Sequence, residues 1–223
     1  MLQRWRSLTF LHWRYEAGEI RRLLPNQVML DTFDGSAWVG LTPFLLTDLR
    51  LPFGPALPWI SRFPETNVRT YVRGPDGEPG VWFFTLEAAR LAAVLGARLT
   101  YALPYRWADM RVSLAHGRVK YQSTRKRPFG YGDTNISIKP AESMRAGEFD
   151  NFLTARYRLY TVRRSRLGYA QIEHDPWPLQ HGKVLELGQN LIEKSGVPRP
   201  SGDPVVHYSA DLEVRIGRIQ WYG

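Results

Sequence analysis

Apolar and polar residues alternate along much of the chain, in short runs that end at turn-forming residues. Such period-two alternation is typical of β-strands with one buried face. Asp34-Gly35 separates two runs within residues 28–51, and this dipeptide favours a tight hairpin turn. Residues 74–77 (Gly-Pro-Asp-Gly) divide residues 65–86 in the same way, and His116-Gly117 divides residues 108–125. The pattern therefore predicts three β-hairpins.

Helical spacing is confined to short segments. Ile20, Leu23 and Leu24 stand at i, i+3 and i+4, and Pro25 ends the helix predicted within residues 16–25. Residues 87–98 predict a second short helix ending near Gly96, and residues 147–160 predict a helix that enters a strand. Residues 166–174 should pair back onto that strand. Residues 187–196 predict a last short helix, and residues 205–219 a closing strand.

These elements amount to roughly ten or more strands and three or four short helices, which predicts a mainly β protein. Regularly spaced antiparallel strands favour a β-barrel or sandwich with helices at its ends. The proline-rich, apolar segment at residues 51–60 is expected to be a loop that covers another part of the protein. No Gly/Ser linker, repeat or low-complexity tract interrupts the sequence, so we expect residues 1–223 to form a single domain.

Composition narrows the function classes. Apolar residues make up 43% of the chain and charged residues 23%, as in globular proteins. The absence of cysteine excludes a thiol nucleophile, a disulfide scaffold and a cysteine-ligated zinc site. No apolar run reaches the ~18 residues of a membrane span, and the N-terminus lacks the apolar core of a signal peptide. A cytoplasmic protein without membrane partners is expected.

The formal charge of +9 makes nucleic acid the first partner to consider. Arginine supplies 25 of the 30 basic residues, and these arginines are spread along the chain. The densest groups are Arg125, Lys126 and Arg127, followed by Arg163, Arg164 and Arg166. A solvated basic surface is the favoured interpretation, and nucleic acid or an acidic partner remains the less favoured alternative.

Motifs for known cofactors and metals are missing from the sequence. There is no GxSxG, GxxxxGK[ST] or GxGxxG motif, so no cofactor is expected. The five histidines do not pair at metal-ligand spacing. Glu173, His174, Asp175 and His181 surround a Pro-Trp-Pro turn, and proline prevents the helix that could align them. A structural turn is therefore favoured over a metal site.

Two segments carry candidate polar chemistry. Alternation places Glu65, Asn67, Arg69 and Tyr71 on one face of a strand, either lining a polar cavity or facing solvent. In residues 103–107 (Leu-Pro-Tyr-Arg-Trp), the proline forces extended backbone before it and then the chain changes direction. This segment is either a rigid corner between strands or a loop at a binding site.

Several stretches together resemble the YqjF-like family of uncharacterised bacterial proteins, over nearly the whole chain. They include LTFLHWRYE (8–16), SRFPETNVRTYV (61–72), GVWFFTLEAARL (80–91), ALPYRWADM (102–110) and IEHDPWPL (172–179). That family is grouped by fold with acetoacetate decarboxylase. The resemblance therefore implies a closed, mostly antiparallel β-barrel with an internal cavity.

The resemblance also implies site residues. In acetoacetate decarboxylase the equivalent loop reads Phe-Pro-Lys-Lys, and one lysine forms a Schiff base with the keto acid. Here Tyr105 and Arg106 stand in place of the two lysines, and Arg98 lies in the segment that precedes the loop. A phenol forms no imine and arginine stays protonated, so we expect no Schiff-base decarboxylase. Arg6 and Glu65 match an active-site Arg and Glu of that family, whereas Gly40 replaces a second Glu.

Three hypotheses of function follow. The leading one is a cavity that binds a small polar or anionic organic molecule. Its expected ligand-binding residues are Arg6, Asn67, Arg69, Trp82, Phe84, Arg98 and Arg106. The second is a non-covalent enzyme for enolisation, hydration or decarboxylation, with Glu65 as acid/base and Tyr105 or Arg106 as oxyanion stabiliser. The third is nucleic-acid or acidic-partner binding through the arginine groups. A homo-oligomeric state stays open.

Overall fold

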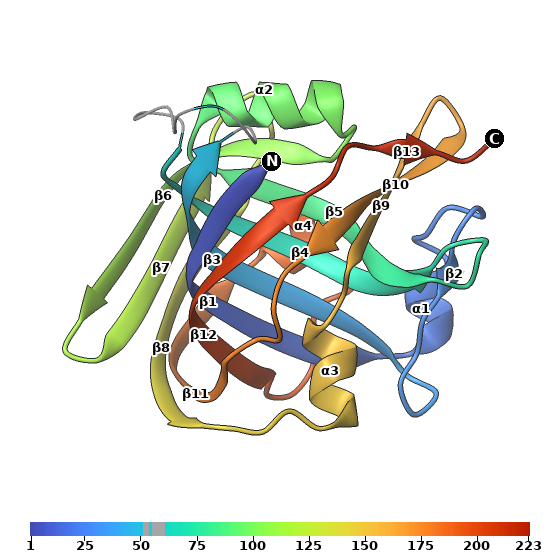
Figure 1. The fold of residues 1–223 in the computed structure, drawn as a ribbon. Helices are drawn as coiled ribbons and strands as arrows, with labels where there is room; N and C mark the ends of the chain where they lie inside the picture. The colour runs from blue at the N-terminus through green and yellow to red at the C-terminus, as the bar shows by residue number, and fades with distance from the viewer. Residues whose placement is uncertain (51–53, 55–60) are drawn as a thin grey trace.

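The computed structural model of the chain describes residues 1–50, 54 and 61–223. Within these residues the chain forms one sheet of 13 strands and four short helices (Figure 1). In chain order the elements are β1 (Leu2–Tyr15), α1 (Ala17–Arg21), β2 (Met29–Leu30), β3 (Ala37–Arg50), β4 (Phe63–Arg73), β5 (Pro79–Ala88), α2 (Leu91–Thr100), β6 (Tyr105–Ala115), β7 (Arg118–Arg125), β8 (Asp133–Ser143), α3 (Glu148–Thr154), β9 (Arg158–Arg163), β10 (Arg166–Glu173), β11 (Leu179–Gln189), α4 (Leu191–Lys194), β12 (Val205–Ile216) and β13 (Gln220–Trp221). The predicted mainly β class is confirmed.

The hydrogen-bonded pairs of strands form two circuits, each of which begins and ends at β5. One runs from β5 through β6, β7, β8, β11, β12, β1, β3 and β4 back to β5. The other runs from β5 through β9, β10, β12, β1, β3 and β4 back to β5. The five strands β12, β1, β3, β4 and β5 belong to both circuits. Figure 1 places α2 at one end of these strands and α3 at the other.

Because β4 belongs to both circuits, it is buried on both of its faces. Every residue from Phe63 to Val72 is buried except Pro64, which is half-buried. Val68 packs in one hydrophobic core, with Leu41 and Ile136. Tyr71, on the opposite face, packs in a second core with other strands and with α3. A polar residue of this strand therefore has no route to solvent on either side.

The predicted hairpin turns are present. Asp34 and Gly35 adopt φ values of 48° and 69°, and His116 and Gly117 adopt 51° and 69°. Positive φ at both central residues is the mark of the turn that matches the twist of paired strands. β4 and β5 form the hairpin around Gly77, and β6 pairs with β7 as predicted.

Three local predictions were wrong. The helix expected over residues 187–196 is reduced to Leu191–Lys194, because residues 187–189 belong to β11. The strand before Asp34 was expected to pair with β3, but β2 pairs with β4, because Asp31 is held there by Arg73 (2.9 Å) and Arg156 (2.7 Å). The helix expected over residues 87–98 begins only at Leu91. Glu87 lies in β5 instead, since it pairs in the sheet with β6 and finds a charge partner on β7.

Other segments stand apart from the predicted pattern. The alternation did not single out the long strands β1, β8 and β11, because β1 is buried on both faces over much of its length and β11 changes register.

The proline-rich loop expected at residues 51–60 lies outside the described residues except for Gly54. Among the helices in the described part of the chain, none is long and apolar enough to cross a membrane.

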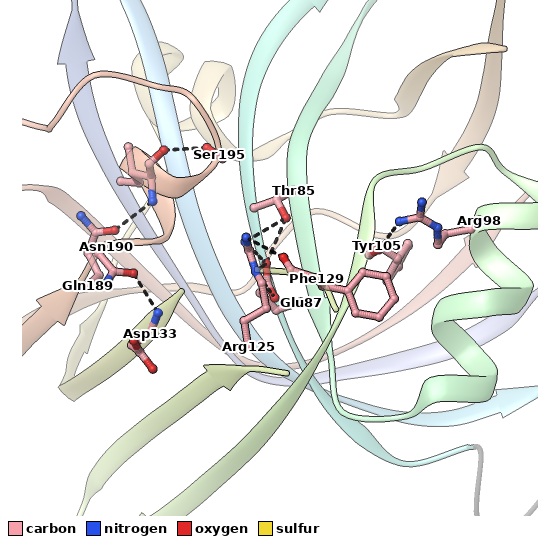
Figure 2. A network of polar contacts seen from close by, with 11 residues as sticks. Thr85, Glu87, Arg98, Tyr105, Arg125, Phe129, Asp133, Gln189, Asn190 and Ser195 are labelled. Atoms are coloured by element: carbon pink, nitrogen blue, oxygen red, sulfur yellow. Dashed lines mark hydrogen bonds and ion pairs between the residues drawn. The ribbon is translucent and has the colours of Figure 1, made fainter. Parts of the chain in front are cut away.

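A buried ion pair ties β5 to β7. The guanidinium of Arg125 donates to both carboxylate oxygens of Glu87, at 2.5 Å (Nη2–Oε1) and 3.1 Å (Nε–Oε2) (Figure 2). The two side chains are 5% and 0% exposed. The same guanidinium lies within 3.4 Å of Thr85 Oγ1 and 3.5 Å of the Phe129 carbonyl. The pair is thus satisfied on all sides and joins strands that the chain connects only through α2 and β6.

This ion pair predicts a large cost when one partner is removed. Arg125→Met or Glu87→Leu should each lower the free energy of unfolding by about 3–5 kcal/mol, because one buried group is left uncompensated. The double variant Glu87→Leu/Arg125→Met should lose less than either single variant. Denaturant unfolding of the four proteins measures both effects. Additive losses in the double variant would contradict this account.

Candidate functional site

A pocket of about 280 Å³ lies on the second-core side of the shared strands. We call it the central pocket. Its floor comes from β1, β3, β4 and β5, and its remaining walls from α2, β6, the segment after α3, β10, the Pro-Trp-Pro turn and β12. α2 turns small residues towards it, namely Ala93, Gly96 and Ala97. Most of its other lining side chains are aromatic or aliphatic.

The polar face of β4 lines the central pocket. Glu65, Asn67 and Arg69 all contribute to its wall, and they are 5%, 3% and 6% exposed. Of the two interpretations left open by alternation, the solvent-exposed face is excluded. The reason is the double burial of β4: neither side of this strand reaches the surface.

Glu65 and Tyr105 form a hydrogen-bonded pair at one end of this row. Tyr105 Oη donates to Glu65 Oε2 at 3.0 Å. Burial raises the pKa of Glu65 to about 8, although the Tyr105 hydrogen bond partly opposes the shift. Burial and the Glu65 carboxyl raise the pKa of Tyr105 well above its usual range. At neutral pH the pair is therefore a protonated carboxylic acid beside a neutral phenol.

Arg69, at the other end of the row, lacks a carboxylate partner among the described residues. Its Nη2 donates to the Leu153 carbonyl at 3.4 Å, and its buried Nε has no hydrogen-bond partner. The guanidinium lies 5.1 Å from the centre of the Phe10 ring. Arg156, which also lines the pocket, is by contrast paired with Asp31 at 2.7 Å. The pocket thus contains a buried cation whose charge is not neutralised.

More unsatisfied polar atoms gather around Arg69. Thr42 lies directly opposite Asn67 across the β3–β4 ladder, and Thr42 Oγ1 and Asn67 Oδ1 are both buried without a hydrogen-bond partner. Gly40 lies opposite Arg69 on one side and His12 on the other. The buried Nδ1 of His12 is likewise without a partner, while its Nε2 lies 2.6 Å from Tyr71 Oη.

His12 is a residue that sequence reasoning missed as part of this site. A side chain at Gly40 would place its Cβ 2.9 Å from the His12 ring, so the imidazole fills the space that a glutamate would need. Burial and the nearby Arg69 lower the pKa of His12 well below its usual range, so the imidazole is neutral at pH 7. The glycine in the sequence was the available signal, since it stands where the resemblance implies a Glu.

The structure places other expected site residues outside the central pocket. Gln3 and Trp5 line it, so alternation turns Arg6 outward, where its Nε lies 3.7 Å from Asp211. In the same way Phe83 lines the pocket, whereas Trp82 and Phe84 line a separate hollow on the opposite face of β5. The expectation that Arg6, Trp82 and Phe84 form one cavity wall with Glu65 does not hold.

The corner at residues 103–107 sends its side chains in different directions. Tyr105 points into the pocket, and Arg106 faces the other side of β6, opposite Glu87 in the ladder. Burial and the nearby Arg125 and Arg98 lower the pKa of Arg106. Arg98 donates to the Tyr105 carbonyl at 2.8 Å from the exposed side of α2 (Figure 2). The segment is both a rigid corner and, through Leu103 and Tyr105, part of the pocket.

Two further expectations from the sequence concern a metal site and the groups of basic residues. No group of three His, Cys, Asp or Glu side chains in the described residues could hold a metal ion. His174 stacks on Tyr157 and Trp177, and His207 lies 2.9 Å from Asp150. Arg125 is buried against Glu87, and Lys126 lies over the Trp107 ring at 4.5 Å.

Comparison with known proteins assigns this chain to a family. The model of DUF2071, a family described as an uncharacterized conserved protein, matches residues 2–213. The chain belongs to this family. The uncharacterized protein YqjF of Bacillus subtilis (strain 168) is 38% identical over 216 residues, which cover 96% of this chain and 89% of YqjF. The resemblance to the YqjF-like family is therefore confirmed.

Solved structures with the same fold are distant in sequence. The enduracididine biosynthesis enzyme MppR with HEPES bound superposes with a TM-score of 0.72 at 11% identity, covering 100% of this chain and 87% of MppR. Acetoacetate decarboxylase from Legionella pneumophila superposes with a TM-score of 0.65 at 13% identity, covering 100% and 88%. At these identities the comparison establishes the acetoacetate decarboxylase-like fold of this DUF2071 chain.

The raised pKa of Glu65 predicts a pH-dependent stability. The unfolded chain ionises this group near its ordinary pKa of 4.5, and the folded chain near 8. Since the folded state binds more protons between these values, stability falls as pH rises through this window, by up to about 5 kcal/mol. Glu65→Gln keeps a neutral hydrogen-bonding side chain and should lack this loss.

Denaturant unfolding of both proteins at about pH 5, 7 and 8.5 measures the effect. The difference in unfolding free energy should shift in favour of Glu65→Gln as pH rises. A difference that stays constant across this range would show that Glu65 ionises in the folded protein near its ordinary pKa.

Proposed function

We propose that this chain binds a small organic acid in the central pocket, with the carboxylate of the ligand on Arg69. The observation that carries the proposal is the buried guanidinium of Arg69, which has no carboxylate within ion-pair distance among the described residues. In this proposal the two circuits of strands act as a closed barrel wall around the ligand cavity.

Energetics support an anionic ligand. A buried charge without a partner is costly, and a fold retains one where a ligand supplies the opposite charge. The planar guanidinium can hold a carboxylate through two charge-assisted hydrogen bonds. Arg69 lines the pocket, and its Nε has no hydrogen-bond partner among the described residues. Among the other pocket arginines, Arg156 is already neutralised by Asp31.

The fold relatives are consistent with a small-molecule site. MppR has been solved with HEPES and with pyruvate bound. Covalent capture of a keto acid through lysine is not part of the proposal, because no lysine is among the pocket-lining residues that the structure describes. Tyr105 occupies the corner where the resemblance implies a lysine, and a phenol cannot form an imine.

A second candidate function is a proton-transfer enzyme without covalent catalysis. The observation that favours it is the Glu65–Tyr105 pair: a carboxyl with a pKa of about 8, hydrogen-bonded at 3.0 Å to a phenol in the same pocket. A group that titrates near neutral pH is suited to general acid/base work on a bound organic acid. Arg106 is not part of this candidate, since it faces away from the pocket.

Nucleic-acid binding has less support. Arg125, the first residue of its densest basic group, is buried in the ion pair with Glu87 and cannot reach a phosphate. Arg163, Arg164 and Arg166 are exposed, and two of them hydrogen-bond backbone carbonyls, those of Leu99 and Tyr222. Two of the three exposed arginines in this second group are thus already engaged with the protein's own backbone.

Arg69→Met tests the proposal through two quantities: the stability of the ligand-free protein and its affinity for carboxylates. Removing an unpaired buried charge should leave the ligand-free protein as stable as wild type or more stable. The same change should weaken binding of simple carboxylates at least about tenfold, since it removes the charge-assisted contacts. Calorimetric titration with butanoate and octanoate measures the second effect, and denaturant unfolding the first.

Arg6→Ala is the matched control, because it removes an exposed arginine outside the pocket. It should bind these acids as wild type does. Equal affinity of wild type and Arg69→Met, or a loss of several kcal/mol in the ligand-free Arg69→Met protein, would contradict the proposed role of Arg69.

A further inference from the structure

Building on the proposed function, we infer a ligand class: an elongated, mainly apolar monocarboxylate that carries a neutral hydrogen-bond acceptor, such as a ketone, at its far end. The carboxylate lies at Arg69, the apolar body crosses the pocket, and the acceptor lies at Glu65 and Tyr105. Three features of the pocket lead to this assignment: the separation of its two polar ends, the character of its walls, and the charge at each end.

The two polar ends of the pocket are far apart. Glu65 and Arg69 are four residues apart on β4 and line the same pocket. At about 3.3 Å of rise per residue, their Cα atoms are separated by roughly 13 Å. The two side chains do not form an ion pair, and the pKa of Glu65 is shifted by burial and by Tyr105 but not by Arg69. A ligand that contacts both ends must therefore be elongated.

The walls of the pocket are mainly apolar, although Asn67 lies between Glu65 and Arg69 on β4. Trp5, Phe44 and Phe63 lie on one side, from β1, β3 and β4. Leu86 and Leu103 lie on the other side, from β5 and the corner before β6. Burial of a hydrocarbon body against such walls contributes about a fourfold gain in affinity for each methylene group. Short, fully polar acids would leave this surface unused.

Among the described lining residues, no arginine or lysine side chain lies at the far end of the pocket. Tyr105 donates its proton to Glu65, so the remaining donor at this end is the proton of the Glu65 carboxyl itself. A neutral carbonyl oxygen can accept that proton. A second carboxylate of the ligand would be buried beside a carboxyl and a phenol, and the arginines that line the described pocket lie elsewhere, at positions 69 and 156.

Matched eight-carbon acids test the ligand class. Calorimetric titration at pH 7 compares butanoate, hexanoate and octanoate for chain length, and then octanoate, 7-oxooctanoate and octanedioate for the far end. Affinity should rise about fourfold per methylene along the first series. 7-Oxooctanoate should bind about fivefold or more tightly than octanoate, and octanedioate about tenfold or more weakly.

Glu65→Met should abolish the preference for 7-oxooctanoate over octanoate, whereas Arg6→Ala, outside the pocket, should keep the affinities for both acids. Binding that depends on Arg69 but does not increase with chain length, or that favours octanedioate, would overturn the ligand class and leave the carboxylate site standing. Equal binding of all these acids by wild type and Arg69→Met would overturn the carboxylate site itself, and the ligand class with it.

Discussion

Burial of β4 on both faces is the constraint on which the site depends. Because β4 belongs to both circuits of strands, both of its faces are buried: Val68 packs in one core, and Tyr71, on the opposite face, packs in another. Glu65, Asn67 and Arg69 are therefore inside the molecule whatever their polarity. An isolated hairpin with the same sequence would turn these three residues to water.

The buried ionisable residues fall into two groups, those in ion pairs and those without an oppositely charged partner among the described residues. Arg125 and Arg156 are neutralised by Glu87 and Asp31, and these pairs fasten strands that are distant in the sequence. Glu65 and Arg69 are not paired with each other or, among the described residues, with any opposite charge, although they share a strand face. The first arrangement serves folding, whereas the second leaves a neutral acid and a free cation facing a pocket. That difference is why the central pocket, and not the more charged surface, is the site of interest.

The corner at Tyr105 shows how one fold can present different chemistry. The backbone route through Leu103 and Pro104 brings Leu103 and Tyr105 to the pocket and turns Arg106 away from it. At this corner, where the resemblance implies a lysine amine, the chain presents the phenol of Tyr105. On the facing strand, Gly40 leaves room for the His12 imidazole, so that end of the pocket also differs from what the resemblance implies.

The sequence by itself determined the turns, the β4–β5 and β6–β7 hairpins and the mainly β class, because turn residues and period-two alternation act locally. It also placed Glu65, Asn67 and Arg69 on a common face. The tertiary structure alone decided that this face is inside, that Arg6 and Arg106 turn away from the pocket, and that Glu87 belongs to a strand. Alternation defines two faces of a strand but not which of them is buried. That choice depends on pairing between strands far apart in the chain, here the closure of β12, β1, β3, β4 and β5 into two circuits at once.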